Sequence, residues 1–218
     1  DRTIVLTPTL LVPDNSETEK MLSRLEENFL ANRDGNIFFG VALSWPETKL
    51  NGGKPTEEES AALEYAKKRM SELNRKYPST DNRFYLFFRD RKWSTDEQSW
   101  VEWERKRGKI IDFVHLLRYP TDSSFCFSTA TAEFLSTIKY VITVDDDVTI
   151  PRDTAKKLIA TIIHPLNVSV IDKETRMVVR GYGIIQPRIS TQMHERGKSM
   201  ANYIFEGDSG WDSYSNAS

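Results

Sequence analysis

The feature that most constrains the fold of this chain is a set of short, almost entirely apolar segments. They are Thr3–Leu11, Ile37–Leu43, Phe84–Phe88 and Tyr140–Val144. Their shortness and their β-branched and aromatic residues predict strands rather than buried helices. Nearly continuous apolar strands are typical of a sheet that is covered on both faces, as parallel sheets are. We therefore predict an α/β fold in which helices flank a mostly parallel sheet.

Helical patterns separate these segments. Ser16 and Glu19 have the spacing of a capping box in front of a helix, and Thr56 and Glu59 repeat that spacing. A third helix is predicted from apolar residues at helical spacings, namely Trp100, Trp103, Ile110, Val114 and Leu117. Thr149–Arg152 is predicted to open another helix, with Pro151 near its first turn. The last pattern is a hairpin or meander between residues 168 and 189.

Composition limits the domain count and the class of partner. A chain of 218 residues with 39% hydrophobic residues can bury a substantial core, and we predict one domain over residues 1–218. Its net charge of -2 argues against nucleic acid as a partner. Cys126 is expected to be buried between Phe125 and Phe127 in a protein of a reducing compartment. We find no membrane span or signal peptide in the sequence, so we expect a soluble piece of a larger protein.

Three consecutive aspartates, Asp145, Asp146 and Asp147, directly follow the fourth predicted strand. In open α/β sheets ligands bind beyond the carboxyl ends of the strands. If the segment is extended, Asp145 and Asp147 point one way and Asp146 the other. Their oxygen ligands suit Mg²⁺ or Mn²⁺, which could bridge the diphosphate of a nucleotide sugar. The alternative is that these residues only cap the next helix or form a solvated turn.

A basic segment precedes the aspartates. Glu104–Lys109 carries four cations. Basic side chains near the start of a helix could reach a diphosphate, and Gly108 permits close approach of the backbone to a ligand. The alternative is a solvated helix face with Trp100 and Trp103 in the core. The three histidines share no metal-ligand spacing, and hydrolase, metalloprotease and dinucleotide motifs are absent from the sequence.

Taken together, these segments resemble the glycosyltransferase domain of bacterial cyclic β-1,2-glucan synthases, relatives of the processive inverting transferases. The resemblance covers nearly the whole chain. Its most specific segments are Pro8–Leu11, Leu30–Asp34, Arg91–Trp93, Trp103–Lys109, Tyr140–Arg152, His164–Asn167, Gly181–Arg188 and Gly207–Asp208 with Gly210 and Asp212.

The resemblance implies a Rossmann-like nucleotide-diphospho-sugar transferase (GT-A) fold, truncated at its C-terminus. It further implies UDP-glucose as donor, a glucan acceptor, inversion, and Mg²⁺ or Mn²⁺ as cofactor. Asp145 and Asp147 would bind the metal. The nucleotide sugar would contact these residues: Thr7, Pro8, Thr9, Lys106, Gly108, Lys109, Asp145 and Asp146.

Two departures from the family pattern stand out. After the second strand, relatives tend to have an aspartate that is expected to contact the uracil of the donor. This chain has Ser44-Trp45 there, so the contact is absent or is made by Glu47. Lys109 replaces the asparagine of the family's Lys-x-Gly-Asn segment. The family also continues beyond Gly207-Asp208, so we expect no catalytic residue in this chain and a general base beyond Ser218.

The resemblance also implies a context. The parent protein would carry membrane helices and a phosphorylase-like domain, with this domain at the cytoplasmic face of the bacterial inner membrane. Two other hypotheses stay open. One is a non-catalytic interaction or regulatory module that keeps the fold but does not bind donor. The other is a transferase that uses another sugar nucleotide.

Overall fold

The computed structural model describes residues 1–119 and 123–187. The chain divides into two compact units, Asp1–Lys157 and Leu158–Ser218. Helix α5 (Thr154–Ile163) contains the boundary between them. The organisation of residues 1–218 as a single domain stays a prediction. The predicted motif residues Arg188, Gly207, Asp208, Gly210 and Asp212, and also His194, lie outside the described residues.

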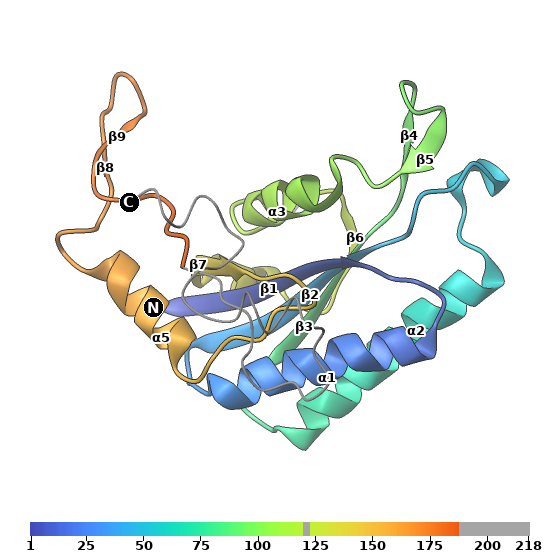
Figure 1. Ribbon diagram of the computed structural model, residues 1–218, viewed down its shortest axis with the longest axis horizontal. Coiled ribbons are helices and arrows are strands. Elements are labelled where there is room, and N and C mark those ends of the chain that lie inside the picture. The colour runs from blue at the N-terminus through green and yellow to red at the C-terminus, as the bar shows by residue number, and fades with distance from the viewer. Residues whose placement is uncertain (120–122, 188–218) are drawn as a thin grey trace, which may run out of the picture. The chain divides into compact units, whose positions relative to one another are not determined.

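The first unit is built on a five-stranded sheet with the order β6-β3-β2-β1-β7 (Figure 1). Strands β1 (Arg2–Leu10), β2 (Ile37–Ser44), β3 (Phe84–Arg89) and β7 (Ile138–Thr143) are parallel. Strand β6 (Phe125–Ser128) pairs antiparallel to β3 at one side of the sheet. The predicted α/β class and mostly parallel sheet are therefore confirmed.

Helices cover both faces of this sheet. Helices α1 (Asn15–Ala31) and α2 (Glu57–Lys76) lie on one face, and α3 (Arg105–Leu116) lies on the other (Figure 1). Phe29 of α1 packs edge-on against Phe39 and Phe84, whereas Phe113 of α3 packs against Phe87. Every residue of β2 and β3 is buried, which explains why these strands contain almost no polar residues.

The two predicted capping boxes have different outcomes. At α2 the prediction is confirmed, because Thr56 Oγ1 accepts from the Glu59 backbone and Glu59 accepts from the Thr56 backbone. At α1 it is wrong, because Asp14 is the N-cap and accepts from the Ser16 backbone N–H at 2.7 Å. Glu19 instead accepts from Arg69 of α2, so a tertiary ion pair replaces the local contact.

The predicted third helix begins later than its apolar pattern indicated. Trp100 belongs to a small hairpin of β4 (Lys92–Ser94) and β5 (Ser99–Val101), and Trp103 lies between that hairpin and α3. The buried face of α3 is Gly108, Lys109, Phe113 and Leu116, while Val114 is exposed. The apolar spacing misled because Trp100, in the hairpin, and Trp103, in the segment after it, are in phase with the helix that follows.

Three further expectations need correction or completion. Helix α5 begins at Thr154, after the predicted opening at Thr149–Arg152, and Pro151 precedes it by three residues. Cys126 is exposed, because β6 is a lateral strand whose Phe125, and not Cys126, packs on the core. A short helix, α4 (Ala132–Ser136), leads into β7 in a stretch for which the sequence predicted no element. None of these changes the order of the main strands.

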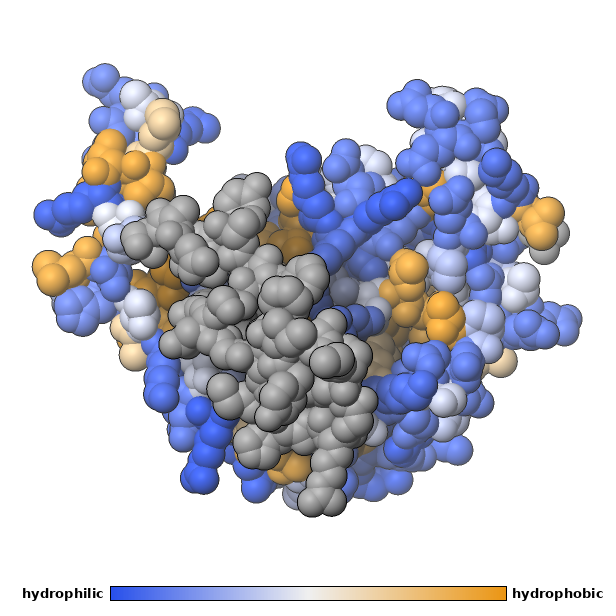
Figure 2. All heavy atoms as spheres, in the orientation of Figure 1, coloured by the Kyte–Doolittle hydropathy of each residue, from blue (hydrophilic) through white to orange (hydrophobic). Residues whose placement is uncertain are grey.

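The second unit contains the predicted hairpin. Strands β8 (Val170–Ile171) and β9 (Val178–Arg180) pair antiparallel around a turn in which Asp172 accepts from the backbones of Glu174 and Thr175. Apolar side chains gather on this hairpin in Figure 2. Those exposed to solvent are Val170, Ile171, Met177, Val178 and Val179. Throughout the described residues, every helix is too short or too polar to cross a bilayer.

Candidate functional site

The parallel strands end together at one end of the sheet, called here the carboxyl end. Leu10, Ser44 and Arg89 close β1, β2 and β3, and the aspartates follow β7. Val144 still donates its backbone N–H to Leu6 of β1 at 3.0 Å, so the sheet pairing continues to the residue before Asp145. The three carboxylates therefore begin where the rigid scaffold stops, at the position where α/β proteins bind ligands.

The aspartates lie in a turn and not in an extended segment. The Val148 backbone N–H donates to the Asp145 carbonyl at 3.1 Å, which defines an aspartate turn of residues 145–148. The Asp146 carboxylate accepts from Thr9 Oγ1, and the Asp145 carboxylate contacts Lys106 Nζ. The expected alternation, with Asp146 facing away, is therefore wrong, because it requires extended backbone.

The aspartate turn is held in place from α1. The buried Asn28 side chain accepts from the Ile150 backbone N–H at 2.7 Å and donates to the Val148 carbonyl at 3.2 Å. The buried Asn32 donates to the Ile150 carbonyl at 3.2 Å and accepts from the Ala155 backbone N–H at 3.0 Å. Asn28 of α1 and Asn32 at its C-cap thus fix the backbone that directly follows the carboxylates.

Lys109 is buried at the same end of the sheet, with 2% of its side chain exposed. Its ammonium donates to the Thr9 carbonyl and, at 3.1 Å, to Ser44 Oγ, and it pairs with Glu102 at 3.0 Å. Burial lowers the pKa of Lys109 below its ordinary value, although Glu102 opposes that shift. Lys109 therefore ties the ends of β1 and β2 to α3.

Arg89, 1% exposed, extends this arrangement to β3. Its guanidinium donates to Asp112 at 2.6 Å and to Glu102 at 3.4 Å. With Lys109 these residues form a charge network of two cations and two carboxylates, Arg89, Glu102, Lys109 and Asp112. A buried set with equal charges of both signs avoids the large cost of an isolated buried charge.

The charge network fixes the start of α3. Glu104 and Arg105 both have positive φ angles, 52° and 49°, a conformation that costs energy for residues with side chains. The Arg89 guanidinium donates to the carbonyls of Trp103, at 2.8 Å, and of Arg105, at 3.3 Å, on either side of this turn. A Cβ on Gly108 would lie 2.8 Å from Glu104 Cβ and closer still to the Trp103 carbonyl. Only glycine fits there.

No family model matches the chain. Over 215 residues, 98% of its length, the chain is 32% identical to cyclic beta-(1,2)-glucan synthase NdvB of Rhizobium meliloti. The resemblance to the cyclic β-1,2-glucan synthases is confirmed. The chain spans 7% of the length of that relative, so the match is to a segment of a much longer synthase.

The residues predicted from the glucan synthase pattern are only partly brought together. Thr9, Lys106, Lys109, Asp145 and Asp146 converge at the carboxyl end of the sheet. Thr7 and Pro8 lie deeper in β1 and are buried. Gly108 packs against Trp103 within the chain. In the part of the chain that the structure describes, the Asp147 carboxylate has neither a hydrogen bond nor an ion pair, and it is exposed.

The departure from the glucan synthase pattern at Ser44-Trp45 has a structural explanation. Ser44 Oγ accepts from Lys109, the residue that departs from the family's asparagine. Trp45 is buried and packs edge-on against Phe88 at 4.7 Å, while Glu47 is exposed. The two departures are therefore neighbours in space, and the serine hydroxyl and the lysine ammonium satisfy each other.

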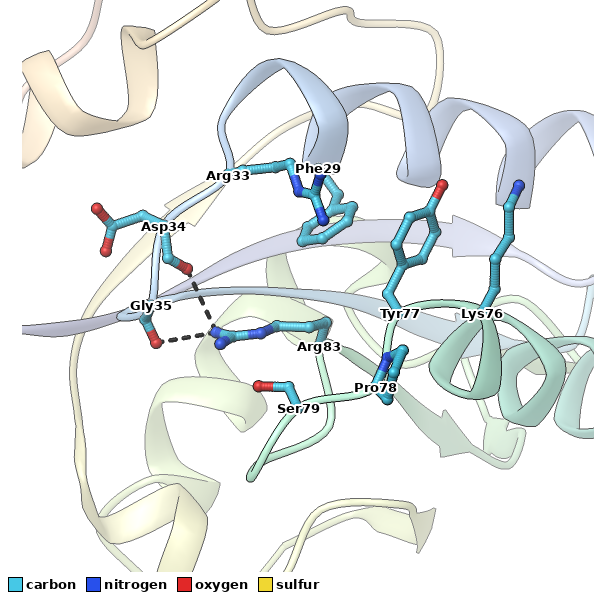
Figure 3. Close-up of a pocket in the computed structure, with 9 residues that line it drawn as sticks. All are labelled: Phe29, Arg33, Asp34, Gly35, Lys76, Tyr77, Pro78, Ser79 and Arg83. Atoms are coloured by element: carbon cyan, nitrogen blue, oxygen red, sulfur yellow. Dashed lines mark hydrogen bonds between the residues drawn. The ribbon is translucent and has the colours of Figure 1, made fainter.

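A separate pocket lies at the opposite, amino end of the sheet (Figure 3). Its volume is about 380 Å³, and its lining includes Arg33, Gly35, Lys76, Tyr77 and Arg83. The Arg33 guanidinium stacks over Phe29, and Arg83 donates to the carbonyls of Asp34 and Gly35. The basic residues follow or end α1 and α2, where cations offset the negative ends of helices. This pocket is therefore a helix-end feature, apart from the site that the glucan synthase pattern predicts.

Sequence reasoning missed four residues that build the site, Asn28, Arg89, Glu102 and Asp112. One signal was available for Arg89, because a charged residue that directly follows Phe84–Phe88 stands at the carboxyl end of a buried strand. For Glu102 and Asp112 the sequence offers no signal, since they meet Arg89 only through the packing of α3 on the sheet.

Proposed function

We propose that this chain is the donor-binding part of a glycosyltransferase that contributes to β-1,2-glucan synthesis, with UDP-glucose as donor and inversion at the anomeric carbon. The observation that carries the proposal is the convergence of Asp145, Asp146, Lys106 and Thr9 at the carboxyl end of the sheet, in a chain similar to a glucan synthase. The parallel sheet with this order is compatible with a Rossmann-like fold, and we propose that it is of the GT-A type.

The carboxylates present fit a small divalent cation. Mg²⁺ and Mn²⁺ take hard oxygen ligands, and Mg²⁺ in particular is usually held by one or two carboxylates plus phosphate oxygens and water. We propose Asp145 and Asp147 as those two carboxylates. Among the described residues no group of three or more histidine, cysteine, aspartate or glutamate side chains is placed to hold a metal. A two-carboxylate site that the donor diphosphate completes agrees with that arrangement.

The chain's own residues have distinct roles in the proposed chemistry. The metal, when bound, stabilises the charge that develops on the departing diphosphate. Lys106, on the exposed first turn of α3, would contact the same diphosphate, and Asp146 is oriented by Thr9. Thr7, Pro8 and Gly108 shape the backbone against which the nucleotide lies. Lys109 acts through Thr9 and Ser44 and is therefore a positioning residue.

The remaining parts of the reaction are assigned to the larger protein. An acceptor hydroxyl of a glucan would attack the anomeric carbon after a base beyond Ser218 removes its proton. We propose that the membrane helices and phosphorylase-like domain of the parent protein hold this domain at the cytoplasmic face of the membrane. The 7% share of the relative that the chain spans leaves room for such parts.

Calorimetry with UDP and Mn²⁺ tests the proposal. Wild-type chain should bind UDP with Mn²⁺, and the double variant Asp145→Ala, Asp147→Ala should lose at least about tenfold in affinity. A matched control, Glu57→Ala with Glu58→Ala, removes two exposed carboxylates from the first turn of α2 and should bind as the wild type does. Equal affinity of the aspartate variant and the wild type would contradict the metal assignment.

One observation favours a second candidate function, a non-catalytic interaction or regulatory module. Two of the cations at the carboxyl end of the sheet already have partners within the chain, since Lys106 pairs with Asp145 and Lys109 donates to Ser44. This candidate predicts no thermal shift with any sugar nucleotide plus metal. A shift of several degrees eliminates it. Comparing UDP, GDP and CDP sugars in the same assay tests whether the donor is a different sugar nucleotide.

A further inference from the structure

The carboxylate proposed as a metal ligand is occupied by a cation of the chain itself. Lys106 Nζ contacts Asp145 Oδ1, and the two side chains are 48% and 52% exposed. A lysine ammonium is a compact point charge, as a small metal ion is, and it lies where a cation bound by Asp145 would be. The two cations could not both approach one carboxylate closely without repelling each other.

The neighbouring Lys109 and Asp146 have partners of their own, which leaves Lys106 as the cation that can change its partner. Lys109 is buried against Glu102 and Ser44, and Asp146 is hydrogen-bonded to Thr9. Within the described segments, Lys106 is the basic residue that contacts the aspartate turn. If another cation binds Asp145, we therefore expect the Lys106 side chain to be the first group that moves.

The backbone beneath Lys106 is held firmly while its side chain is free to move. Arg89 donates to the carbonyls of Trp103 and Arg105 directly before Lys106, and Gly108 packs closely on the Trp103 carbonyl. The four-carbon side chain of Lys106, by contrast, is flexible and half-exposed. Lys106 can therefore leave Asp145 without any movement of α3.

We propose that Lys106 competes with the divalent cation for Asp145 and is drawn away from it by the donor diphosphate. The proposal rests on the proposed function, because it concerns the same metal and diphosphate. When a diphosphate binds, it offers Lys106 a more highly charged partner than one carboxylate. Asp145 is then released to bind the metal. Metal and nucleotide consequently assist each other's binding, and that coupling is reciprocal.

The proposal predicts effects of opposite sign for one substitution. Lys106→Gln should tighten the binding of Mn²⁺ alone by about two- to fivefold, because a half-exposed ion pair contributes no more than that. The same substitution should weaken the binding of UDP in the presence of Mn²⁺ by about tenfold, because a charge-assisted contact to the diphosphate is lost. A purely structural role for Lys106 would weaken both.

Two control variants separate competition from general electrostatics. Arg107→Gln removes a neighbouring positive charge, 78% exposed, whose partner is Glu104 and not Asp145. It should change the affinity for Mn²⁺ alone by less than Lys106→Gln does. Lys106→Arg keeps the charge and should keep both the weak binding of Mn²⁺ alone and the binding of UDP. Thermal unfolding by circular dichroism checks that each variant is folded.

The experiment is a titration of the full chain with Mn²⁺ by electron paramagnetic resonance, followed by calorimetry with UDP. Tighter Mn²⁺ binding in Lys106→Gln than in wild type and Arg107→Gln supports competition. Unchanged or weaker Mn²⁺ binding in Lys106→Gln overturns it, even if wild type binds UDP with Mn²⁺ and the proposed function stands. Tighter Mn²⁺ binding without any UDP binding supports competition and overturns the proposed function. If no variant binds Mn²⁺, both are wrong.

Discussion

The two ends of the same sheet are both rich in basic residues, but these residues differ in burial and in their partners. At the carboxyl end, the side chains of Arg89 and Lys109 are 1% and 2% exposed and pair with Glu102 and Asp112. At the amino end, Arg33 is exposed and stacks on Phe29 and Tyr77. There Lys76, whose side chain is 61% exposed, pairs with Glu26.

The difference shows which cations hold the fold and which meet the solvent. Cations at the amino end follow the carboxyl ends of α1 and α2, where they offset the helix dipoles at low cost because they stay hydrated. Burial of charges at the carboxyl end costs desolvation energy. The pairing of each cation with a carboxylate offsets that cost, although the buried Arg89 Nε has no hydrogen-bond partner among the described residues. Its effect is to fix the α3 turn beside the aspartates. The exposed pair of Lys106 and Asp145 is then available to a ligand.

The largest expected contrast is between Arg89 and Arg83. Arg89→Met leaves Glu102 and Asp112 without their guanidinium and should lower the free energy of unfolding by about 3 to 5 kcal/mol. Arg83→Met loses two hydrogen bonds from a half-buried guanidinium to carbonyls and should cost about 1 kcal/mol. Urea unfolding measures both, with Arg89→Lys as an intermediate variant in case Arg89→Met does not fold. Similar losses for both arginines would erase the contrast.

The next contrast concerns pH. Burial raises the pKa of Glu59, but hydrogen bonds from Arg91 and the Thr56 backbone outweigh it and hold the pKa below its ordinary value of 4.5. The folded pKa is lower than the unfolded one, so this stabilisation is present above pH 4.5 and is lost as the pH falls through the folded pKa. Glu59→Gln should cost about 2 kcal/mol at pH 7 and progressively less below pH 4.5.

Glu26 at the amino end provides the comparison for Glu59. Its pKa is also lowered, because hydrogen bonds from Lys76 and Tyr77 outweigh the effect of burial, but its lysine partner is exposed. Glu26→Gln should therefore show the same sign of pH dependence with a smaller amplitude, since solvent screens the pair. Urea unfolding of both variants at several pH values measures the two amplitudes. A larger amplitude at Glu26 would reverse the comparison.

A pair of glycines tests the packing of the two ends. Gly108→Ala places a methyl group against the Trp103 carbonyl, which should cost about 1 to 2 kcal/mol after the gain in helix propensity. Gly35→Ala at the amino end meets nothing within 4 Å and should be neutral or stabilising by a few tenths of a kcal/mol. The midpoints of urea unfolding measure both changes in stability. A Gly108→Ala variant as stable as Gly35→Ala would show that the turn before α3 is not tightly packed.

The smallest expected effect on stability is that of Lys106→Gln. Because both side chains of the pair with Asp145 are about half-exposed, its loss should change the free energy of unfolding by less than about 1 kcal/mol. A loss comparable to that of Arg89→Met would mean that Lys106 belongs to the structural network and is not available to a ligand.

Much of the fold was predictable from the sequence because local patterns determine it. Continuous apolar runs predicted both ends of β1, β2, β3 and β7 to within two residues. Thr56 with Glu59 predicted the start of α2. Predictions failed where a local signal had a stronger tertiary competitor. Glu19 pairs with Arg69 across two helices, and Trp100 pairs with Trp93 across a hairpin.

The candidate site was predictable only in part, for the same reason. Strand order along the chain places Asp145–Asp147 at the carboxyl end of a strand, and this much follows from the sequence. Which side chains meet them does not, because Thr9, Lys106 and Asn28 are far from the aspartates in sequence.

The amino-acid sequence by itself determined an α/β chain with a parallel sheet, helices on its two faces and three carboxylates after one strand. Periodicity and strand ends are local properties, and they survive in any packing of the elements. Only the tertiary structure decided that Arg89, Glu102, Lys109 and Asp112 form one buried network and that Lys106 occupies Asp145. Charge pairing depends on distances of a few ångströms between residues remote in sequence, and such distances exist only once the chain has folded.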